Sequence, residues 1–121
     1  MSTLLLHMCT DAQWHLALDA GEIRAESPDP QRFLHLSTPQ QVHLPANRLY
    51  AGRTDLVLLC VDPGRLDSEI RWEPGVPGDL ASMRFPHLYG PLPTASVVAV
   101  LDYRPDATGH FEPPIGVPVL T

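Results

Sequence analysis

Hydrophobic residues occur along the chain mostly in short runs of the length of β-strands. Four such runs, which predict strands buried on both faces, cover residues 4–8, 33–36, 56–61 and 97–101.

A fifth segment, residues 68–73, alternates instead: Ile70 and Trp72 lie on one side and Glu69, Arg71 and Glu73 on the other. Alternation with a period of two is typical of a strand with one exposed face. Residues 85–89 are a weaker candidate, because a proline at position 86 lacks a backbone N–H and predicts an edge strand or a strand start.

Two segments carry the start signals of helices. Residues 10–13 form a capping box that precedes apolar residues at helical spacing, and Gly21 predicts the end of that helix. Residues 38–41 form a second box with proline at the first helical position. Because Pro45 has no N–H to donate, it is expected to kink or split the second helix.

The length and composition are those of one globular domain, with 121 residues of which 44% are hydrophobic and 18% charged. The chain has 14 prolines, which cluster at residues 28–30, 74–77, 86–93 and 113–118 and so mark connections and a tail. We therefore expect one domain over residues 1–104 and an extended proline-rich tail over residues 105–121. No apolar run has the ~20 residues of a membrane helix. The N-terminus lacks the basic start of a signal peptide, and we therefore expect a cytoplasmic protein without membrane partners.

Charge and cysteine content limit the chemistry further. The formal net charge of −6 disfavours binding to duplex nucleic acid, which requires basic side chains to displace counterions. All 8 basic residues are arginine, which excludes Schiff-base chemistry and the lysine-bearing phosphate loop. Cys9 and Cys60 lie in apolar runs without C-x-x-C spacing, so we expect buried thiols in a reducing compartment.

Two stretches of the chain repeat one pattern that places a histidine three residues before a helix cap. Residues 5–13 and 33–41 each contain an apolar pair, a histidine, an apolar residue, a small residue, a threonine, and a glutamine three places later. His7 and His35 therefore lie where a strand leads into a helix N-terminus, a place where free N–H groups attract anions. His87 is a third histidine in a strand. A shared ligand site and three half-buried structural histidines remain open as interpretations.

Further polar residues near the strand ends are candidate ligand contacts, each with a structural alternative. Ser37 and Thr38 can contact a ribose or a phosphate, although the helix cap also explains Thr38. Tyr89 can stack on a base or bond to a ligand, or be an ordinary strand aromatic. Glu73 can bind a ribose hydroxyl or act as an acid or base, or lie in a solvated turn.

For other residues a structural role is the default interpretation. Arg24 and Arg32 can bind phosphate but are expected in surface ion pairs, and Trp72 is expected in the core. The histidines expected to face solvent are His15, His43 and His110. The sequence contains no G-x-S-x-G, G-x-G-x-x-G or H-E-x-x-H motif, so hydrolase, dinucleotide-fold and zincin chemistry lack support.

Taken together, residues 4–101 resemble the bacterial family called domain of unknown function 952. The motifs that carry the resemblance are His7 with Thr10, Trp14, Gly21-Glu22, residues 33–38, residues 46–50, Asp62-Pro63, residues 71–73 and residues 85–92. That family is similar in fold to the ADP-ribosyltransferases, which bind NAD with a split β-sheet. The first half also resembles RNA 2′-phosphotransferases, at His7, Gly21 and residues 35–37.

The resemblance implies an α+β fold of ADP-ribosyltransferase type, with two N-terminal helices and a split, mostly antiparallel sheet of about six strands. It places His7 at the adenosine-side ribose or pyrophosphate, and His35 with residues 37–38 along the nicotinamide ribose. Many ADP-ribosyltransferases carry a glutamate on a late strand. The matching strand here carries His87, and Glu73 comes one strand earlier.

The leading hypothesis is therefore a cleft for NAD, ADP-ribose or a related phosphorylated nucleotide, with glycosidic or phosphoryl transfer as the reaction. His35 or His87 would act as acid or base near neutral pH. The expected ligand contacts are His7, Thr10, Ser37, Thr38, Glu73 and Tyr89. The alternative is a non-catalytic module that binds a metabolite or a partner and in which the histidines are structural. Zinc held by three histidines ranks below both hypotheses, so no metal is expected.

Overall fold

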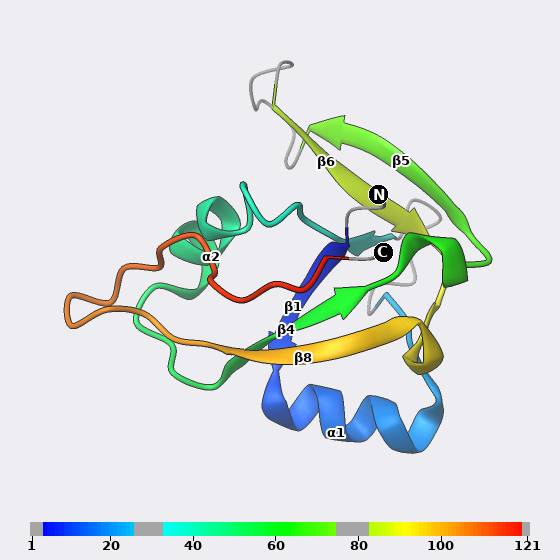
Figure 1. The fold of residues 1–121 in the computed structure, drawn as a ribbon, viewed down its shortest axis with the longest axis horizontal. Coiled ribbons are helices and arrows are strands. Elements are labelled where there is room, and N and C mark those ends of the chain that lie inside the picture. Colours follow the sequence, from blue (N-terminus) through cyan, green and yellow to red (C-terminus); the bar gives the residue numbers. More distant parts are fainter. Residues whose placement is uncertain (1–3, 26–32, 75–82, 120–121) are drawn as a thin grey trace.

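Three antiparallel sheets and two α-helices make up the described residues, 4–25, 33–74 and 83–119, of a computed structural model (Figure 1). The strands are β1 Leu5–Thr10, β2 Glu22–Ile23, β3 Leu34–His35, β4 Leu56–Val61, β5 Glu69–Pro74, β6 Arg84–Tyr89, β7 Leu92–Pro93 and β8 Val97–Tyr103. The helices are α1 Asp11–Ala20 and α2 His43–Tyr50, with 3-10 turns η1 Pro63–Arg65 and η2 Thr94–Ser96. The expected α+β class and the mostly antiparallel pairing are confirmed.

The sheet β1-β4-β8 forms the centre of the fold because its middle strand, β4, has every residue buried. One face of this sheet packs on α2 and on Phe111 from the C-terminal segment. The other face packs on apolar side chains of the second sheet, β3-β6-β5, and on Trp14 from α1. A strand covered on both faces reads as a continuous hydrophobic run, which is why β4 is predicted with its correct bounds.

One backbone bridge joins the two three-stranded sheets. Leu6 on β1 and Ser37, two residues after β3, exchange N–H···O bonds of 2.7 and 2.8 Å. The expected sheet of about six strands is therefore two sheets of three strands joined by this bridge, with β2 and β7 as a further pair. The sequence pattern misses β2 and β7, since two residues are too few to show alternation.

The strand that contains Pro86 lies in the middle of its sheet, whereas the sequence predicts an edge strand or a strand start. On the β5 side, Pro86 is opposite Trp72. On the β3 side, the carbonyl of Pro86 accepts from the N–H of Leu36 at 2.9 Å, just beyond the end of β3. A residue directs its N–H and its carbonyl to the same neighbouring strand. The N–H that Pro86 lacks would therefore point towards Leu36, beyond the end of β3. Its absence removes no hydrogen bond from the ladder between β3 and β6.

The first helix forms as predicted, and the second begins later than predicted. Thr10 caps α1 in a full capping box, and Gly21 ends it in the left-handed conformation with φ of 84°. The second helix begins at His43, after a turn over residues 38–42. Pro45 thus lies in the first turn, where an N–H needs no helical partner, so no kink arises.

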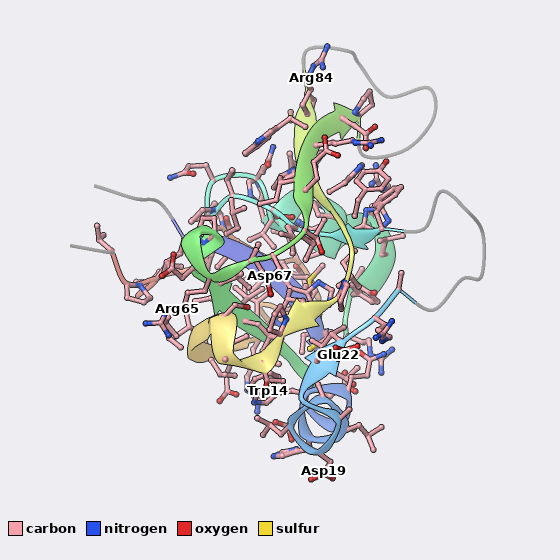
Figure 2. The ribbon with its side chains drawn as sticks, turned by 90° about the vertical axis from the view of Figure 1, so that its right-hand side faces the viewer. Trp14, Asp19, Glu22, Arg65, Asp67 and Arg84 are labelled. Carbon is pink, nitrogen blue, oxygen red and sulfur yellow. The ribbon has the colours of Figure 1, made fainter. Side chains whose placement is uncertain are left out.

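In Figure 2, Asp19 near the end of α1 and Arg84 at the start of β6 lie at opposite ends of the molecule.

Neither helix in the described part of the chain has the length and apolar character needed to cross a membrane.

The C-terminal segment contributes to the core instead of only covering the surface. Phe111 is fully buried, and its backbone exchanges two hydrogen bonds of 2.7 and 2.9 Å with the side-chain amide of Asn47 on α2. The hydroxyl of Tyr103 also donates to the carbonyl of Glu112 at 2.6 Å. Residues 105–119 contain neither helix nor strand.

We predict that Phe111→Ala lowers the free energy of unfolding by about 3–5 kcal/mol, because it leaves a cavity between α2 and the central sheet. Ile115→Ala is the matched control in the same segment, since Ile115 is 95% exposed, and it should change stability little. Urea denaturation of both variants measures the difference. Equal stability of the two variants would contradict the assignment of Phe111 to the core.

Candidate functional site

The outer face of the sheet β3-β6-β5 brings two of the predicted histidines together. His35 pairs with His87 across β3 and β6, and Arg71 pairs with His87 across β5 and β6. Residues paired in register project to the same face of a sheet, so these three side chains form one row. The imidazole rings of His35 and His87 meet edge to face with their centres 5.1 Å apart.

Glu73 joins this row to Tyr89. One carboxylate oxygen of Glu73 accepts a hydrogen bond of 2.6 Å from the Tyr89 hydroxyl and lies 3.0 Å from Nδ1 of His87. The bond from Tyr89, followed by the one from His87, lowers the pKa of Glu73 below its ordinary value of 4.5. An ionised carboxylate can only accept, so Nδ1 of His87 carries the proton of this hydrogen bond.

His87 itself is enclosed by aromatic side chains. It is 2% exposed, and the ring of Phe33 stacks on it with centres 4.0 Å apart and planes 17° apart. Its Nε2 is buried and has no hydrogen-bond partner among the described residues. On the neighbouring ring of Tyr89, the guanidinium of Arg71 lies 4.4 Å from the ring centre, a cation–π contact. The rings of Phe33 and His35 thus both contact the ring of His87.

His35 is exposed, unlike His87, and lies among groups able to carry positive charge. Loss of hydration is the largest cause that lowers its pKa from 6.5, and the charges of His87, His7 and Arg48 add to it. His35 is therefore mostly neutral at pH 7, the form that can accept a proton. Arg48 is the permanently charged group among these neighbours, and its positive charge favours an anion near the imidazole.

His7 reaches the row from the other sheet. Its Nδ1–H donates to the backbone carbonyl of His35 at 2.9 Å, next to the bridge between Leu6 and Ser37. Burial lowers the pKa of His7, although the bond to His35 opposes the shift. All three histidines named from the sequence are thus linked through His35: His87 contacts its ring and His7 contacts its backbone.

Three other predicted contacts have different environments. The hydroxyl of Thr10 accepts from the N–H of Gln13, so Thr10 acts as a helix cap. Ser37 is buried and its backbone forms the bridge between the sheets. Thr38 lines a cavity that also contains Trp72, a residue that projects from the opposite face of β5 to Glu73. The expectation that Trp72 is a core residue is wrong, because it is 47% exposed.

The remaining predictions divide between confirmed and corrected ones. Arg24 forms an ion pair with Glu22, whereas Arg32 lies outside the described residues. Exposed positions are found for His15 and His110, each beside a carboxylate. His43 is only half-exposed, and its buried Nδ1 has no partner among the described residues, so its predicted solvent-facing position is wrong.

Both cysteines are buried, as predicted, and form no disulfide. Burial, followed by the charge of Asp11, raises the pKa of the Cys9 thiol to about 11, and burial also raises that of Cys60. Neither thiol is therefore a thiolate near neutral pH. In the described ranges, no group of three or more His, Cys, Asp or Glu side chains is arranged to hold a metal ion.

Phe33 and Arg71 belong to the site, yet the sequence argument did not name them as site residues. Phe33 contacts the rings of both His35 and His87, and Arg71 covers the ring of Tyr89. The alternation of side chains along a strand could have identified both residues. Arg71 shares a strand face with Glu73, and Phe33 is two residues before His35.

A sequence profile described as "Protein of unknown function (DUF952)" matches residues 8–100 of the chain. The chain belongs to this family. The resemblance found in the sequence motifs, over residues 4–101, is therefore confirmed at the level of the DUF952 family. No curated protein matches the chain.

Solved structures of one protein, CC0527, share the fold. The crystal structure of protein CC0527 from Caulobacter crescentus is 32% identical, covers 91% of this chain and 94% of that chain, and has a TM-score of 0.74. The solution NMR structure of CC0527 is 31% identical, covers 92% and 93%, and has the same TM-score of 0.74. These similarities support the family and the fold, and they carry no statement about activity.

We predict that the imidazole of His35 titrates with a pKa below 6.5 in a pH series of NMR spectra. Arg48→Gln should raise this pKa, because it removes one of the positive charges that lower it. A His35 pKa at or above 6.5, or one unchanged by Arg48→Gln, would contradict the electrostatic description of the site.

The same shifts predict the pH dependence of stability. The pKa values of His7 and His35 are both lowered in the folded state, so the unfolded chain binds more protons once the pH falls below about 6.5. The free energy of unfolding should therefore decrease as the pH falls from 6.5 through the folded-state pKa values. His35→Gln should make that decrease smaller, and denaturant titrations at several pH values measure it. An identical slope in the variant would argue against the shift at His35.

Proposed function

We propose that this chain binds NAD, ADP-ribose or a related phosphorylated nucleotide at the outer face of β3-β6-β5, within a fold of ADP-ribosyltransferase type. The observation that carries the proposal is the position of His35, exposed at the junction of two sheets and surrounded by His7, His87 and Arg48. The positive charge of Arg48 near an exposed imidazole favours a phosphate. This positive group contrasts with the negative net charge of the whole chain.

The aromatic side chains beside His35 suit the remainder of a nucleotide. The rings of Phe33 and Tyr89 lie with their centres 5.2 Å apart on the same sheet face, and such rings can stack on a base. Glu73 is partly exposed and held ionised, so it can accept a hydrogen bond from a ribose hydroxyl. Glu73 comes one strand earlier than the glutamate of many ADP-ribosyltransferases, but its pairing with His87 puts a carboxylate beside the late strand.

The chemistry that this arrangement supports is glycosidic or phosphoryl transfer. Neutral His35 accepts the proton of an attacking hydroxyl or water and returns it to the leaving group. Glu73 keeps the proton of His87 on Nδ1 and stabilises the imidazolium that forms if Nε2 accepts a second proton. Similarity to RNA 2′-phosphotransferases in the first half of the chain adds phosphoryl transfer to the candidates.

A non-catalytic binding module is the second candidate, and the burial of His87 favours it. With Phe33 stacked on its ring and only 2% of its surface exposed, His87 contacts a ligand only if Phe33 moves. In that case the Glu73–His87 pair stabilises the sheet, and His35 alone contacts the ligand. Such a module binds its ligand without converting it.

We predict that ADP-ribose produces saturable shifts of the backbone amides of residues 33–35, 71–73 and 87–89 in ¹H–¹⁵N NMR spectra. His35→Ala should weaken binding at least about tenfold, a loss typical of a charge-assisted contact. Its thermal unfolding midpoint should change little, because the side chain is exposed. His15→Ala, which removes an exposed histidine on α1, is the matched control and should bind normally. Absence of shifts at millimolar ADP-ribose would overturn the nucleotide site.

Incubation with NAD separates the two candidates, and we expect transfer chemistry to release nicotinamide. Chromatographic detection of nicotinamide in the wild-type protein, and its absence in His35→Ala, would support catalysis. Binding of NAD without nicotinamide release would contradict glycosidic transfer, and binding without any conversion of NAD would support the non-catalytic module.

A further inference from the structure

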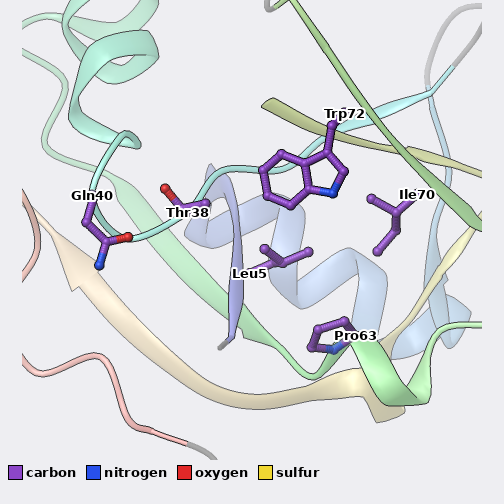
Figure 3. Close-up of a pocket in the computed structure, with 6 residues that line it drawn as sticks. All are labelled: Leu5, Thr38, Gln40, Pro63, Ile70 and Trp72. Carbon is purple, nitrogen blue, oxygen red and sulfur yellow. The ribbon is translucent and has the colours of Figure 1, made fainter. Parts of the chain in front are cut away.

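A second candidate site lies on the opposite face of β5 from the histidine row. It is a cavity of about 460 Å³, and the residues that line it are Leu5, Thr38, Gln40, Pro63, Ile70 and Trp72 (Figure 3). Ile70 and Trp72 project from β5 on the side away from Arg71 and Glu73. The cavity is therefore separated from the proposed nucleotide site by the thickness of the sheet.

Trp72 forms one wall of this cavity and is unusually exposed for its position. On the same sheet face, Leu88 is fully buried, whereas the indole of Trp72 remains 47% exposed. A large aromatic ring left half in water forgoes much of its hydrophobic stabilisation. In Figure 3 the indole lies over the cavity, with Leu5 and Pro63 below it. A flat group that entered between the indole and these aliphatic side chains would bury both surfaces.

The polar groups of the cavity lie on one side. Thr38 and Gln40, from the segment before α2, lie together across the cavity from Ile70 (Figure 3). A hydroxyl and an amide can donate and accept hydrogen bonds but carry no charge. None of the six lining residues is charged, so nothing in the lining compensates the desolvation of an ion. The volume lies within the range of about 300–1,000 Å³ typical of small-molecule sites.

From this arrangement we propose that the cavity binds a small, uncharged, planar ring compound that carries a hydrogen-bonding group on its rim. The ring stacks on the indole of Trp72 and packs against Leu5 and Pro63. The rim group bonds to Thr38 or Gln40. The site is independent of the proposed nucleotide site, since the two lie on opposite faces of one sheet.

Phenol and cyclohexanol form a matched probe pair, because both are neutral, carry one hydroxyl and differ in the planarity of the ring. Trp14 and Trp72 are the 2 tryptophans of the chain, so their indole N–H signals report on the cavity and on a tryptophan that does not line it. Trp14→Phe assigns the two signals. We expect phenol to shift the Trp72 signal saturably, with a Kd on the order of millimolar for so small a ligand, and to leave that of Trp14 unchanged.

Cyclohexanol should bind at least about threefold more weakly than phenol if stacking on the indole contributes. Benzoate, which is planar but anionic, should also bind more weakly because its charge is not compensated. Thr38→Val, which keeps the side-chain shape, should weaken phenol binding by about twofold to tenfold if Thr38 bonds to the hydroxyl. Gln40→Leu tests the other polar group in the same way.

The proposal fails if phenol leaves the Trp72 signal unchanged, or if cyclohexanol or benzoate binds as tightly as phenol. It also fails if neither Thr38→Val nor Gln40→Leu weakens binding. Trp72→Leu should abolish saturable shifts at the amide of Leu5, while the unchanged indole signal of Trp14 reports that the fold is intact. Shifts at residues 33–35 instead would mean that phenol binds at the histidine row.

Discussion

Two backbone hydrogen bonds between Leu6 and Ser37 determine how the rest of the molecule can be arranged. They hold the segment that follows β3 against the beginning of β1, so one short contact connects two three-stranded sheets. One residue along β1, His7 meets the carbonyl of His35, and one residue after Ser37, Thr38 reaches the cavity under Trp72. The histidine row and the cavity therefore both depend on the same register, although they lie on different faces of the second sheet.

The row also shows how the fold accommodates a buried titratable group. An imidazole removed from water loses hydration and needs compensation, which His87 finds in the carboxylate of Glu73 and the stacked ring of Phe33. Only half of its hydrogen-bonding capacity is satisfied within the described residues, because Nε2 has no partner. A buried ring nitrogen without a partner is costly, and the bond from the other nitrogen to Glu73 offsets only part of that cost.

Much of this could be predicted from the sequence, because the strongest signals are local. The continuous apolar run of β4, the capping box at Thr10 and the alternation along β5 each follow from one periodicity or one motif. The start of α2 could not be predicted so well: the box at residues 38–41 forms a turn, and the helix begins beyond it. The central position of β6 depends on how short its partner β3 is, which no property of Pro86 itself reveals.

The site shows the same division between local pattern and long-range contact. Alternation places Glu73 on a polar face, but only the pairing of β5 with β6 brings it to His87, 14 residues away along the chain. The apolar character of one face of β5 favours core positions for Ile70 and Trp72. This argument holds for Ile70, which packs on the core. It fails for Trp72, which lies farther along β5, an edge strand in which the same face lines a cavity. Membership of an apolar strand face thus predicts the direction in which a side chain points, whereas its burial depends on what lies opposite.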